Sequence, residues 1–527
     1  MRTFLIIGIV SLFALTACRK ELDNPNWDTN ILGPLIDANL GFDDIIADTL
    51  FVADADHKLS LVYNGSVYKM EIDSLASLPD TSLQYKLSLP LFINIPPGQL
   101  VYLRNEIVDF NVGDAELRYL RIKSGKIRFQ IKGYLPGDVQ CKYSIPSASI
   151  NGAVFQVTEN LSEAPAGGYS EIEADYDMSG YTFDLTGGGV TTNQLNTRIE
   201  IRTSTTEDTV QFNYGDSLRM IISYIDIVPE YARGYFGYQQ FFSVPEKTGL
   251  SLFEKVVGGE ASFEHLSLFI TMRNGFGVDA NCLITSMTGY NSRDNTTTPL
   301  SSELIGKMIN INSASETGNP ENPVEPSEYV LVIEESAALP FISAFPDSIE
   351  YGFQMQVNPM GNISGGNDFV YYGYGMEIML NAEIPLSLQA DGFTLRDTVE
   401  FDFTNTPETA KIREGDFYLI ADNGFPIDAE VQLFLINAEG EQIATLFLTN
   451  KIEHADLDQN GKAIGQKRSI LHIPADRLQI ADIRDARTAV VQASFSTPDA
   501  GFVTIYDSYS IRLKLTGDFT YGISNEE

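Results

Sequence analysis

Cys18 is the side chain best placed for covalent chemistry in this sequence. It directly follows Leu15-Thr16-Ala17, at the end of an apolar run that has one arginine before it. A thiolate is a nucleophile, and small residues before a cleavage point are typical of an export signal. The run is about a dozen residues long, short of the roughly 20 that a membrane-spanning helix needs. This order predicts a signal peptide over residues 1–17 that is cleaved before Cys18.

The four residues ending at Cys18 resemble the lipobox of bacterial lipoproteins. The resemblance implies that signal peptidase II recognises Leu15, Thr16 and Ala17, and that diacylglycerol is attached to the Cys18 sulfur. It also implies acylation of the new amine, with palmitate-type chains. Several acyl chains anchor a protein durably where a single chain binds marginally.

The residues after the cysteine carry a weaker resemblance. Position 19 is Arg rather than Asp, which by the sorting rule of Gram-negative lipoproteins implies the outer membrane. The acidic residues Glu21 and Asp23 partly match the surface-export pattern of Bacteroidota lipoproteins. Triplets such as Asp216-Ser217-Leu218 and Asp347-Ser348-Ile349 resemble the O-glycosylation sequon of that phylum. We therefore expect a Bacteroidota-like lipoprotein of the outer membrane, with its periplasmic or cell-surface face left open.

The block Gly215-Asp216-Ser217-Leu218 resembles the nucleophile block of GDSL esterases. A serine nucleophile needs an oriented base, which that family carries in a later Asp-x-x-His. The only such pattern here is Asp54-Ala55-Asp56-His57, which lies upstream. The four histidines show no paired spacing of the kind that holds zinc. We assign no catalytic residue and no cofactor, and we expect no enzymatic activity.

Asp456, Asp458 and Asn460 resemble the start of an EF-hand calcium loop, with a glycine at loop position 6. The bidentate acid expected at position 12 is replaced by Lys467. A turn whose Asn-Gly pair reverses the chain explains the same residues, so the pattern is a weak calcium candidate.

Tyr371, Tyr372 and Tyr374 form an aromatic cluster around Gly373, and residues 231–242 form another. Flat rings of this kind stack on sugars, and they also pack in protein cores. They are the candidate glycan-stacking residues, with core packing as the alternative. Cys141 and Cys282 fall at nearly the same place in two similar segments, and we expect both to be buried core residues.

Secondary structure reads as β almost throughout. Apolar residues alternate with polar ones over 127–132 and 511–515, which places each apolar set on one face of a strand. The runs 431–436 and 443–448 are apolar on both faces and predict a hairpin at the centre of a packed body. The best helix candidates are short, at 41–48 and 476–486. The predicted class is all-β, with elongated, tandem sandwich-like domains.

An internal repeat organises the chain. Segments 127–146, 268–287 and 417–436 each contain a strand that ends in a glycine and an aromatic residue, a short polar step and a second strand. A second group of similar segments follows, one after each of these, beginning at Tyr214, Tyr372 and Tyr506. The spacing suits one β sandwich per repeat, and similar strand-turn-strand units in unrelated β proteins are the alternative.

Domain boundaries follow from this repeat. After the signal peptide we expect a lipidated cysteine and tether (18–45), then three β domains. They cover 46–255 with an N-terminal extension, 256–405 and 406–527. The polar, Pro-rich stretch 312–327 is expected to be a long exposed loop inside the second domain.

Composition limits the partners. The 71 acidic and 35 basic residues among 527 give a formal net charge of −36, which repels nucleic acid. Three cysteines do not make a disulfide scaffold. We therefore expect a non-enzymatic, structural or scaffold lipoprotein that contacts the membrane through its lipid and binds other cell-envelope proteins. The alternative is a glycan- or lipid-binding module.

Overall fold

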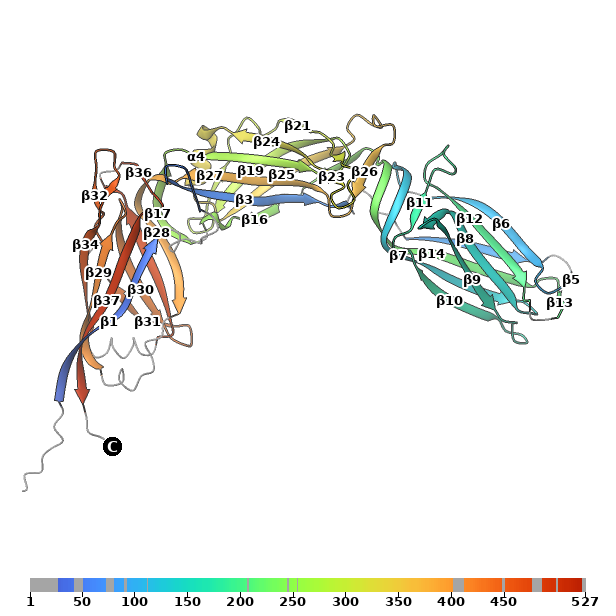
Figure 1. Ribbon diagram of the computed structural model, residues 1–527, viewed down its shortest axis with the longest axis horizontal. Helices are drawn as coiled ribbons and strands as arrows, with labels where there is room; N and C mark the ends of the chain where they lie inside the picture. Colours follow the sequence, from blue (N-terminus) through green and yellow to red (C-terminus); the bar gives the residue numbers. More distant parts are fainter. Residues whose placement is uncertain are drawn as a thin grey trace, which may run out of the picture.

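The computed structural model describes residues 27–41, 51–72, 80–89, 92–110, 112–205, 208–243, 246–253, 255–400, 412–447, 451–475, 486–498 and 501–523. Antiparallel strands dominate these residues and form three bodies along an elongated arch (Figure 1). The predicted all-β class and elongated shape are confirmed. Residues Leu15 to Cys18 and the helix candidate at 41–48 lie outside the described residues except for position 41, and so does nearly all of the candidate at 476–486.

The distal body contains one ten-stranded sheet and a small pair of strands. The strand order is β26-β14-β7-β11-β8-β12-β6, with β10 beside β7, β4 beside β14 and β9 beside β8. The bounds are β4 (Thr81–Ser88), β5 (Ile93–Ile95), β6 (Leu100–Asp109), β7 (Glu116–Tyr134), β8 (Val139–Ile150), β9 (Ala153–Leu161), β10 (Ser170–Asp177), β11 (Thr182–Asp184), β12 (Gln194–Thr203), β13 (Val210–Phe212), β14 (Ser217–Tyr235) and β26 (Asp368–Tyr371).

The middle body packs two sheets against each other. One has the order β2-β3-β27-β18-β24, and the other β15-β25-β19-β20 with β16 and β21 beside it. The bounds are β2 (Phe51–Ala53), β3 (Leu59–Met70), β15 (Gln239–Phe242), β16 (Glu246–Gly249), η2 (Ser251–Phe253), β18 (Ser267–Asn274), β19 (Ala280–Asn291), β20 (Thr296–Pro299), β21 (Met308–Ile311), β22 (Ser315–Glu316), β23 (Val324–Glu325), β24 (Ser327–Ile333), α4 (Glu335–Ser343), β25 (Ser348–Val357) and β27 (Met376–Pro385).

The terminal body holds both ends of the described chain. Its sheets have the orders β1-β37-β29-β34 and β17-β28-β35-β30-β31, with β36 beside β28. The bounds are β1 (Trp27–Gly41), β17 (Val256–Phe263), β28 (Ser387–Glu400), β29 (Ile412–Asn423), β30 (Asp428–Ile436), β31 (Gln442–Phe447), β32 (Asp456–Leu457), β33 (Ala463–Ile464), β34 (Lys467–Ala475), β35 (Thr488–Ser496), β36 (Val503–Thr504) and β37 (Ser510–Ile523).

Alternation along β7 shows why the strands form. Ile127, Phe129 and Ile131 are fully buried, whereas Arg128 and Lys132 between and beside them reach solvent. Residues two apart on a strand share a face, so the apolar set enters the core and the charged set stays outside. One connected cluster of buried apolar residues reaches through all three bodies.

The chain passes between the bodies several times. It enters the terminal body at β1, continues through β2 and β3 of the middle body, builds the distal body, and returns to the middle body at β15. It then visits the terminal body at β17 and ends there from β28 onward. The division of the chain at residues 46, 256 and 406 stays a prediction. The strand pairing adds a feature that this division does not include, because each body takes strands from separate stretches of the chain.

The predicted hairpin forms, but in a different position in its sheet. β30 and β31 pair antiparallel around the turn at 437–440. β31 lies at the edge of its sheet rather than at the centre. Residues 431–434 are only half-buried. The prediction of a central hairpin was wrong because apolar residues on both faces are equally compatible with a half-covered strand.

Candidate functional site

The tyrosines predicted to bind glycan lie where the distal and middle bodies meet. Tyr371 of β26 pairs with Tyr231 of β14, and their ring centres are 4.5 Å apart. Both hydroxyls donate to Oε1 of Glu316 on β22, at 3.0 Å from Tyr371 and 3.1 Å from Tyr231. Arg233 forms an ion pair with the same carboxylate. Burial and the neighbouring Glu316 carboxylate raise the pKa of Tyr371 to about 12, which keeps its hydroxyl a donor.

The other two predicted tyrosines differ in exposure. Tyr374 is half-buried, meets the ring of Tyr371 edge-on at 6.4 Å, and donates its hydroxyl to Oδ1 of Asn322 at 3.0 Å. Tyr372 is exposed, and the ammonium of Lys123 lies 2.8 Å from its ring centre. The three rings therefore do not share one open face. Two of them hold the hairpin of β22 and β23, part of the expected loop at 312–327, against the distal sheet.

Asn358 strengthens the same junction. Its amide nitrogen donates to the Asp368 carboxylate at 2.9 Å and to the carbonyl of Gly237 at 3.3 Å. Gly237 lies in the crossing 236–238 from β14 to β15. Burial raises the pKa of Asp368. The crossing is thus fixed by side chains from the returning part of the chain.

The junction between the middle and terminal bodies centres on Arg293. Its guanidinium donates to the carbonyl of Val256 on β17 and, at 2.9 Å, to the carbonyl of Phe345 after α4. Its Nε donates to Oδ1 of Asn291 at 3.0 Å. One side chain therefore ties a strand of the terminal body to two segments of the middle body. Burial lowers the pKa of Arg293, although arginine stays charged at any ordinary pH.

Phe345 is the apolar part of this junction. Its ring centre lies 5.1 Å from Phe253, 6.4 Å from Phe263 and 5.3 Å from Phe393. Phe263 and Phe393 belong to β17 and β28 of the terminal body. The backbone of Phe345 has a φ of 47°, in the left-handed region that a non-glycine residue occupies only at a cost. The contacts across the junction outweigh that cost.

A cleft of about 560 Å³ opens beside Arg293 and Asp347. Asp347 accepts hydrogen bonds from the backbone N–H of Ser292 at 2.6 Å and from its hydroxyl at 2.5 Å. Ser348 donates its hydroxyl to the same carboxylate at 2.8 Å and is buried. These hydrogen bonds engage both charged groups of the cleft within the fold.

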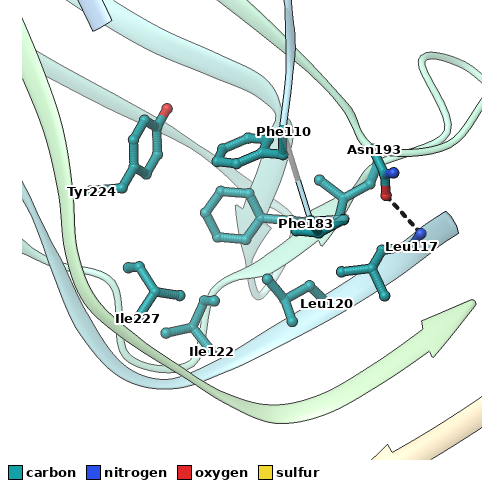
Figure 2. A pocket seen from close by; sticks show the side chains of 10 residues that line it. Phe110, Leu117, Leu120, Ile122, Phe183, Asn193, Tyr224 and Ile227 are labelled. Carbon is teal, nitrogen blue, oxygen red and sulfur yellow. Dashed lines mark hydrogen bonds between the residues drawn. The ribbon is translucent and has the colours of Figure 1, made fainter. Parts of the chain in front are cut away.

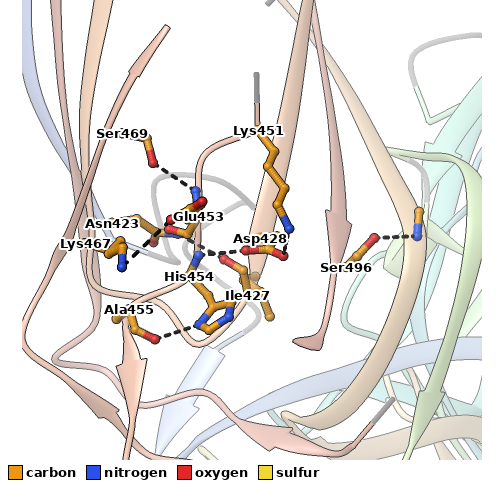
Figure 3. Close-up of polar contacts among 11 residues, drawn as sticks. Asn423, Ile427, Asp428, Lys451, Glu453, His454, Ala455, Lys467, Ser469 and Ser496 are labelled. Atoms are coloured by element: carbon orange, nitrogen blue, oxygen red, sulfur yellow. Dashed lines mark hydrogen bonds and ion pairs between the residues drawn. The ribbon is translucent and has the colours of Figure 1, made fainter. Parts of the chain in front are cut away.

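A buried asparagine organises the third repeat (Figure 3). Asn423 donates from its amide to the carbonyls of Ile427 and Glu453, both at 3.0 Å. Its side-chain oxygen accepts the N–H of Phe425 at 2.9 Å. Asn274 makes the same three contacts in the second repeat, with Val278, Asn312 and Phe276. Each asparagine therefore satisfies three backbone groups at the end of a strand.

An aspartate follows at the equivalent place in all three segments predicted to be repeats. Its Oδ1 accepts a backbone N–H, from Glu163 to Asp138 at 2.7 Å, from Ser313 to Asp279 at 3.1 Å, and from His454 to Asp428 at 2.7 Å. The residue after each of these donors is an alanine. Its N–H donates to the backbone carbonyl of Leu135, Phe276 or Phe425. Leu135, rather than Tyr134 beside the glycine, thus takes the place of the buried phenylalanines, because Gly133 lies one residue farther from its aspartate than Gly275 and Gly424 do. Tyr134 is exposed.

Both core cysteines are buried, and burial raises the pKa of Cys141 and of Cys282 to about 12. Counted from Asp138 and Asp279, they occupy the same position of their repeats. We expect neither thiol to react with a disulfide reagent at mildly alkaline pH in the folded chain carrying Cys18→Ser, because the thiolate is both rare and inaccessible. Both should react once guanidinium unfolds the protein. Rapid labelling of either thiol before unfolding would contradict this expectation.

The calcium candidate folds as a tight turn. Oδ1 of Asp458 accepts the N–H groups of Asn460 and Lys462 at 2.8 and 2.9 Å. Asp456 lies in β32, with its carboxylate 3.8 Å from the Lys467 ammonium. Across the described ranges, no group of three or more acidic, histidine or cysteine side chains is arranged to hold a metal ion. The carboxylate of Asp458 is used by the turn itself.

The esterase-like block opens β14. Ser217 pairs with Ser88 on one side and with Tyr134 on the other. His57 lies in a different part of the molecule, where its ring pairs with Asp507 of the terminal body at 2.9 Å. The serine and the only upstream Asp-x-x-His are therefore not brought together.

The apolar cavities between sheets are small. One in the distal body holds about 30 Å³ and is lined by Phe110, Phe183 and Tyr224 (Figure 2). The Asn193 amide at its edge accepts the N–H of Leu117 at 2.7 Å. A second, in the terminal body, holds about 60 Å³. A water molecule occupies about 30 Å³ in the liquid, so these spaces have the size of one or two waters. Within the described chain, no helix is long and apolar enough to span a membrane.

Comparisons with known proteins give distant likenesses. No family model and no curated protein matches the chain. A crystal structure from Parabacteroides distasonis, described as that of a secreted protein, is 10% identical and covers 93% of this chain and 99% of its own, with a TM-score of 0.27. A chain of the Broad Bean Stain Virus structure is 11% identical over 60% of this chain and 93% of its own, with a TM-score of 0.18. At these TM-scores the likenesses carry no conclusion about function.

Proposed function

We propose that this protein is an outer-membrane-anchored lipoprotein of the Bacteroidota type that serves as a non-enzymatic scaffold and binds other cell-envelope proteins. The observation that carries the proposal is the construction of the two junctions. A scaffold has to hold separate binding surfaces at fixed distances. Junctions closed by hydrogen bonds, packed aromatic rings and repeated chain crossings meet that requirement, whereas a single flexible linker does not.

Each junction restricts bending in more than one way. At the distal end, Glu316 and Asn358 each connect β14 or the segment after it to the middle body. At the terminal end, the N–H of Leu59 donates to the carbonyl of Ile505 at 3.0 Å, and the N–H of Leu386 donates to the carbonyl of Leu59 at 2.9 Å. These contacts supplement Arg293 and Phe345. The three bodies therefore form one stiff arm whose distal body lies farthest from both described ends (Figure 1).

The shared contacts of Asn274 and Asn423, and of the three aspartates, support a common repeat unit. Repeating one structural unit lengthens a protein without requiring a different fold for each part. The anchor at Cys18 comes from the sequence alone and belongs to the proposal.

Native co-purification tests the scaffold proposal. The full-length protein, extracted in mild detergent from its own membranes after light crosslinking, is expected to carry the same envelope proteins in repeated preparations. An unrelated outer-membrane lipoprotein at equal abundance is the control. Recovery of an isolated chain that carries a glycan or a lipid would replace the scaffold by the glycan- or lipid-binding alternative.

A further inference from the structure

The end of the distal body farthest from the termini exposes large apolar side chains. We call this set the distal tip. Its members and their exposed fractions are Phe92 at 70%, Ile93 at 41%, Tyr134 at 48%, Tyr169 at 45% and Tyr214 at 73%. Contiguous exposure of this kind marks an interaction surface more often than it occurs by chance.

Strand pairing brings the members of the distal tip together. Ile93 of β5 pairs with Phe212 of β13, two residues before Tyr214. The turn that contains Tyr214 is bonded to the chain before β5, because the N–H of Gly215 donates to the carbonyl of Leu89 at 3.1 Å. Figure 1 places β5 and β13 at the outer end of the distal body.

The two remaining tyrosines border the same turn. Tyr134 pairs with Ser217, the first residue of β14 after the turn. The ring centres of Tyr134 and Tyr169 are 5.8 Å apart. The distal tip is thus one continuous surface formed by four neighbouring segments.

A row of cations adjoins the distal tip. Arg219 of β14 pairs with Lys86 of β4 on one side and with Lys132 of β7 on the other. Lys132 lies two residues before Tyr134 on the same strand, so both side chains point from the same sheet face. Glu171 of β10, opposite Lys132, is the acidic neighbour in this row. Three cations beside one carboxylate leave the row positive in a chain whose net charge is −36.

The cations remain available for an outside partner. Arg219 donates to the side-chain oxygen of Gln84 at 3.1 Å, and the Lys132 ammonium lies 3.3 Å from the ring centre of Tyr169. Among the ion pairs recorded between described residues, none involves Lys86, Lys132 or Arg219. Their charge is therefore not cancelled within the fold.

We propose that the distal tip binds a lipid surface that carries anionic headgroups. Phe92 and Ile93 are exposed apolar side chains, which gain free energy at the boundary between headgroups and acyl chains. Tyrosine rings suit the headgroup level, because one end is apolar and the hydroxyl stays hydrated. The cation row meets the phosphates from the adjoining face. A soluble polyanion would use the cations but leave Phe92 and Ile93 in water, so the lipid surface accounts for more of the tip.

Vesicle sedimentation tests the proposal on the full mature chain carrying Cys18→Ser, which has no lipid of its own. Binding is expected to vesicles of phosphatidylethanolamine and phosphatidylglycerol, to weaken with added salt, and to be far lower on phosphatidylcholine alone. Since each cation near a charged membrane contributes about fivefold in affinity, the pair Lys86→Glu and Arg219→Glu should lose more than about 20-fold. The pair Phe92→Ser and Tyr214→Ser should lose about tenfold.

Two matched pairs serve as controls. Val330→Ser with Val332→Ser removes exposed apolar side chains from β24, and Arg273→Glu with Lys307→Glu reverses two exposed charges of the middle body. Both control pairs should bind like the parent chain, and circular dichroism checks that all variants are folded. The proposal is overturned if the tip and control pairs bind alike, if phosphatidylcholine vesicles bind equally well, or if the chain binds a soluble anionic polysaccharide but no vesicle.

Discussion

Replacing Asn274 by aspartate is expected to destabilise the middle body by about 3 kcal/mol or more, because a buried carboxylate oxygen then faces two carbonyl oxygens. In the native chain the Asn274 amide donates to Val278 and Asn312 at 2.9 Å. The substitution keeps the size of the side chain and the oxygen that accepts the N–H of Phe276. The loss of stability therefore measures the two donated hydrogen bonds alone. Amide hydrogen exchange in β18 and β19 measures the change in the free energy of local opening.

The chain offers a matched control. Asn437 accepts the N–H groups of Glu439 and Glu441 at 3.1 and 2.8 Å in an exposed turn, contacts that aspartate can preserve. Its amide also donates to the exposed Glu441 carboxylate at 3.3 Å, a bond that water can replace, so Asn437→Asp should lose far less stability than Asn274→Asp. Asn423→Asp should weaken the terminal body as Asn274→Asp weakens the middle one. Equal stability of the Asn274 and Asn437 variants would show that the buried amide is not an essential donor.

Removing the ring of Phe345 is expected to cost about 3 to 5 kcal/mol and to loosen the middle–terminal junction. The ring contacts Phe263 and Phe393 of the terminal body, so its removal leaves a cavity between the two bodies. Alanine keeps the left-handed backbone strain while losing the contacts that outweigh it. Spin labels at Lys307 and Glu439 report the distance between the two bodies, and we expect its distribution to broaden in Phe345→Ala.

Phe155→Ala is the control for that experiment. Phe155 is buried in the distal body, away from the labelled bodies, and its loss removes a similar amount of packing. The label-to-label distribution should stay narrow in this variant even though the distal body is weakened. A distribution that is unchanged in both variants would mean that Arg293 and the chain crossings hold the junction without the aromatic cluster.

Local patterns predicted the local parts of this fold. The alternation around Phe129 specified a strand with one buried face, and it forms as expected. The Asn-Gly-Phe triplets at 274–276 and 423–425 stand in the sequence, but the glycine-aromatic pattern assigns no role to their asparagines. The signal for their role was the same polar residue at equivalent strand ends. A buried amide there is explained by the backbone groups that it satisfies.

The long-range parts could not be read from the sequence. β1 pairs with β37 across nearly the whole chain, and no local periodicity records which distant strand is the partner. From the sequence, Tyr371 and Tyr374 are candidates for sugar stacking or for core packing, because aromatic residue type does not distinguish an open face from a contact with Glu316. The glycine-aromatic pattern matches Tyr134 to Phe276, although the equivalent residue is Leu135, because Gly133 lies one residue farther from its aspartate than Gly275 does.

Under the proposed anchor at Cys18, the pairing of β1 with β37 has a mechanical consequence. Residues 27–41 run along the terminal body before the chain continues to β2 of the middle body. A pull between the anchor and the distal body therefore travels along the covalent backbone of β1. The terminal body lies in parallel with this line of tension rather than in series with it. The terminal body supports the loaded strand over its whole length through the pairing with β37. It need not unfold when the arm is stretched.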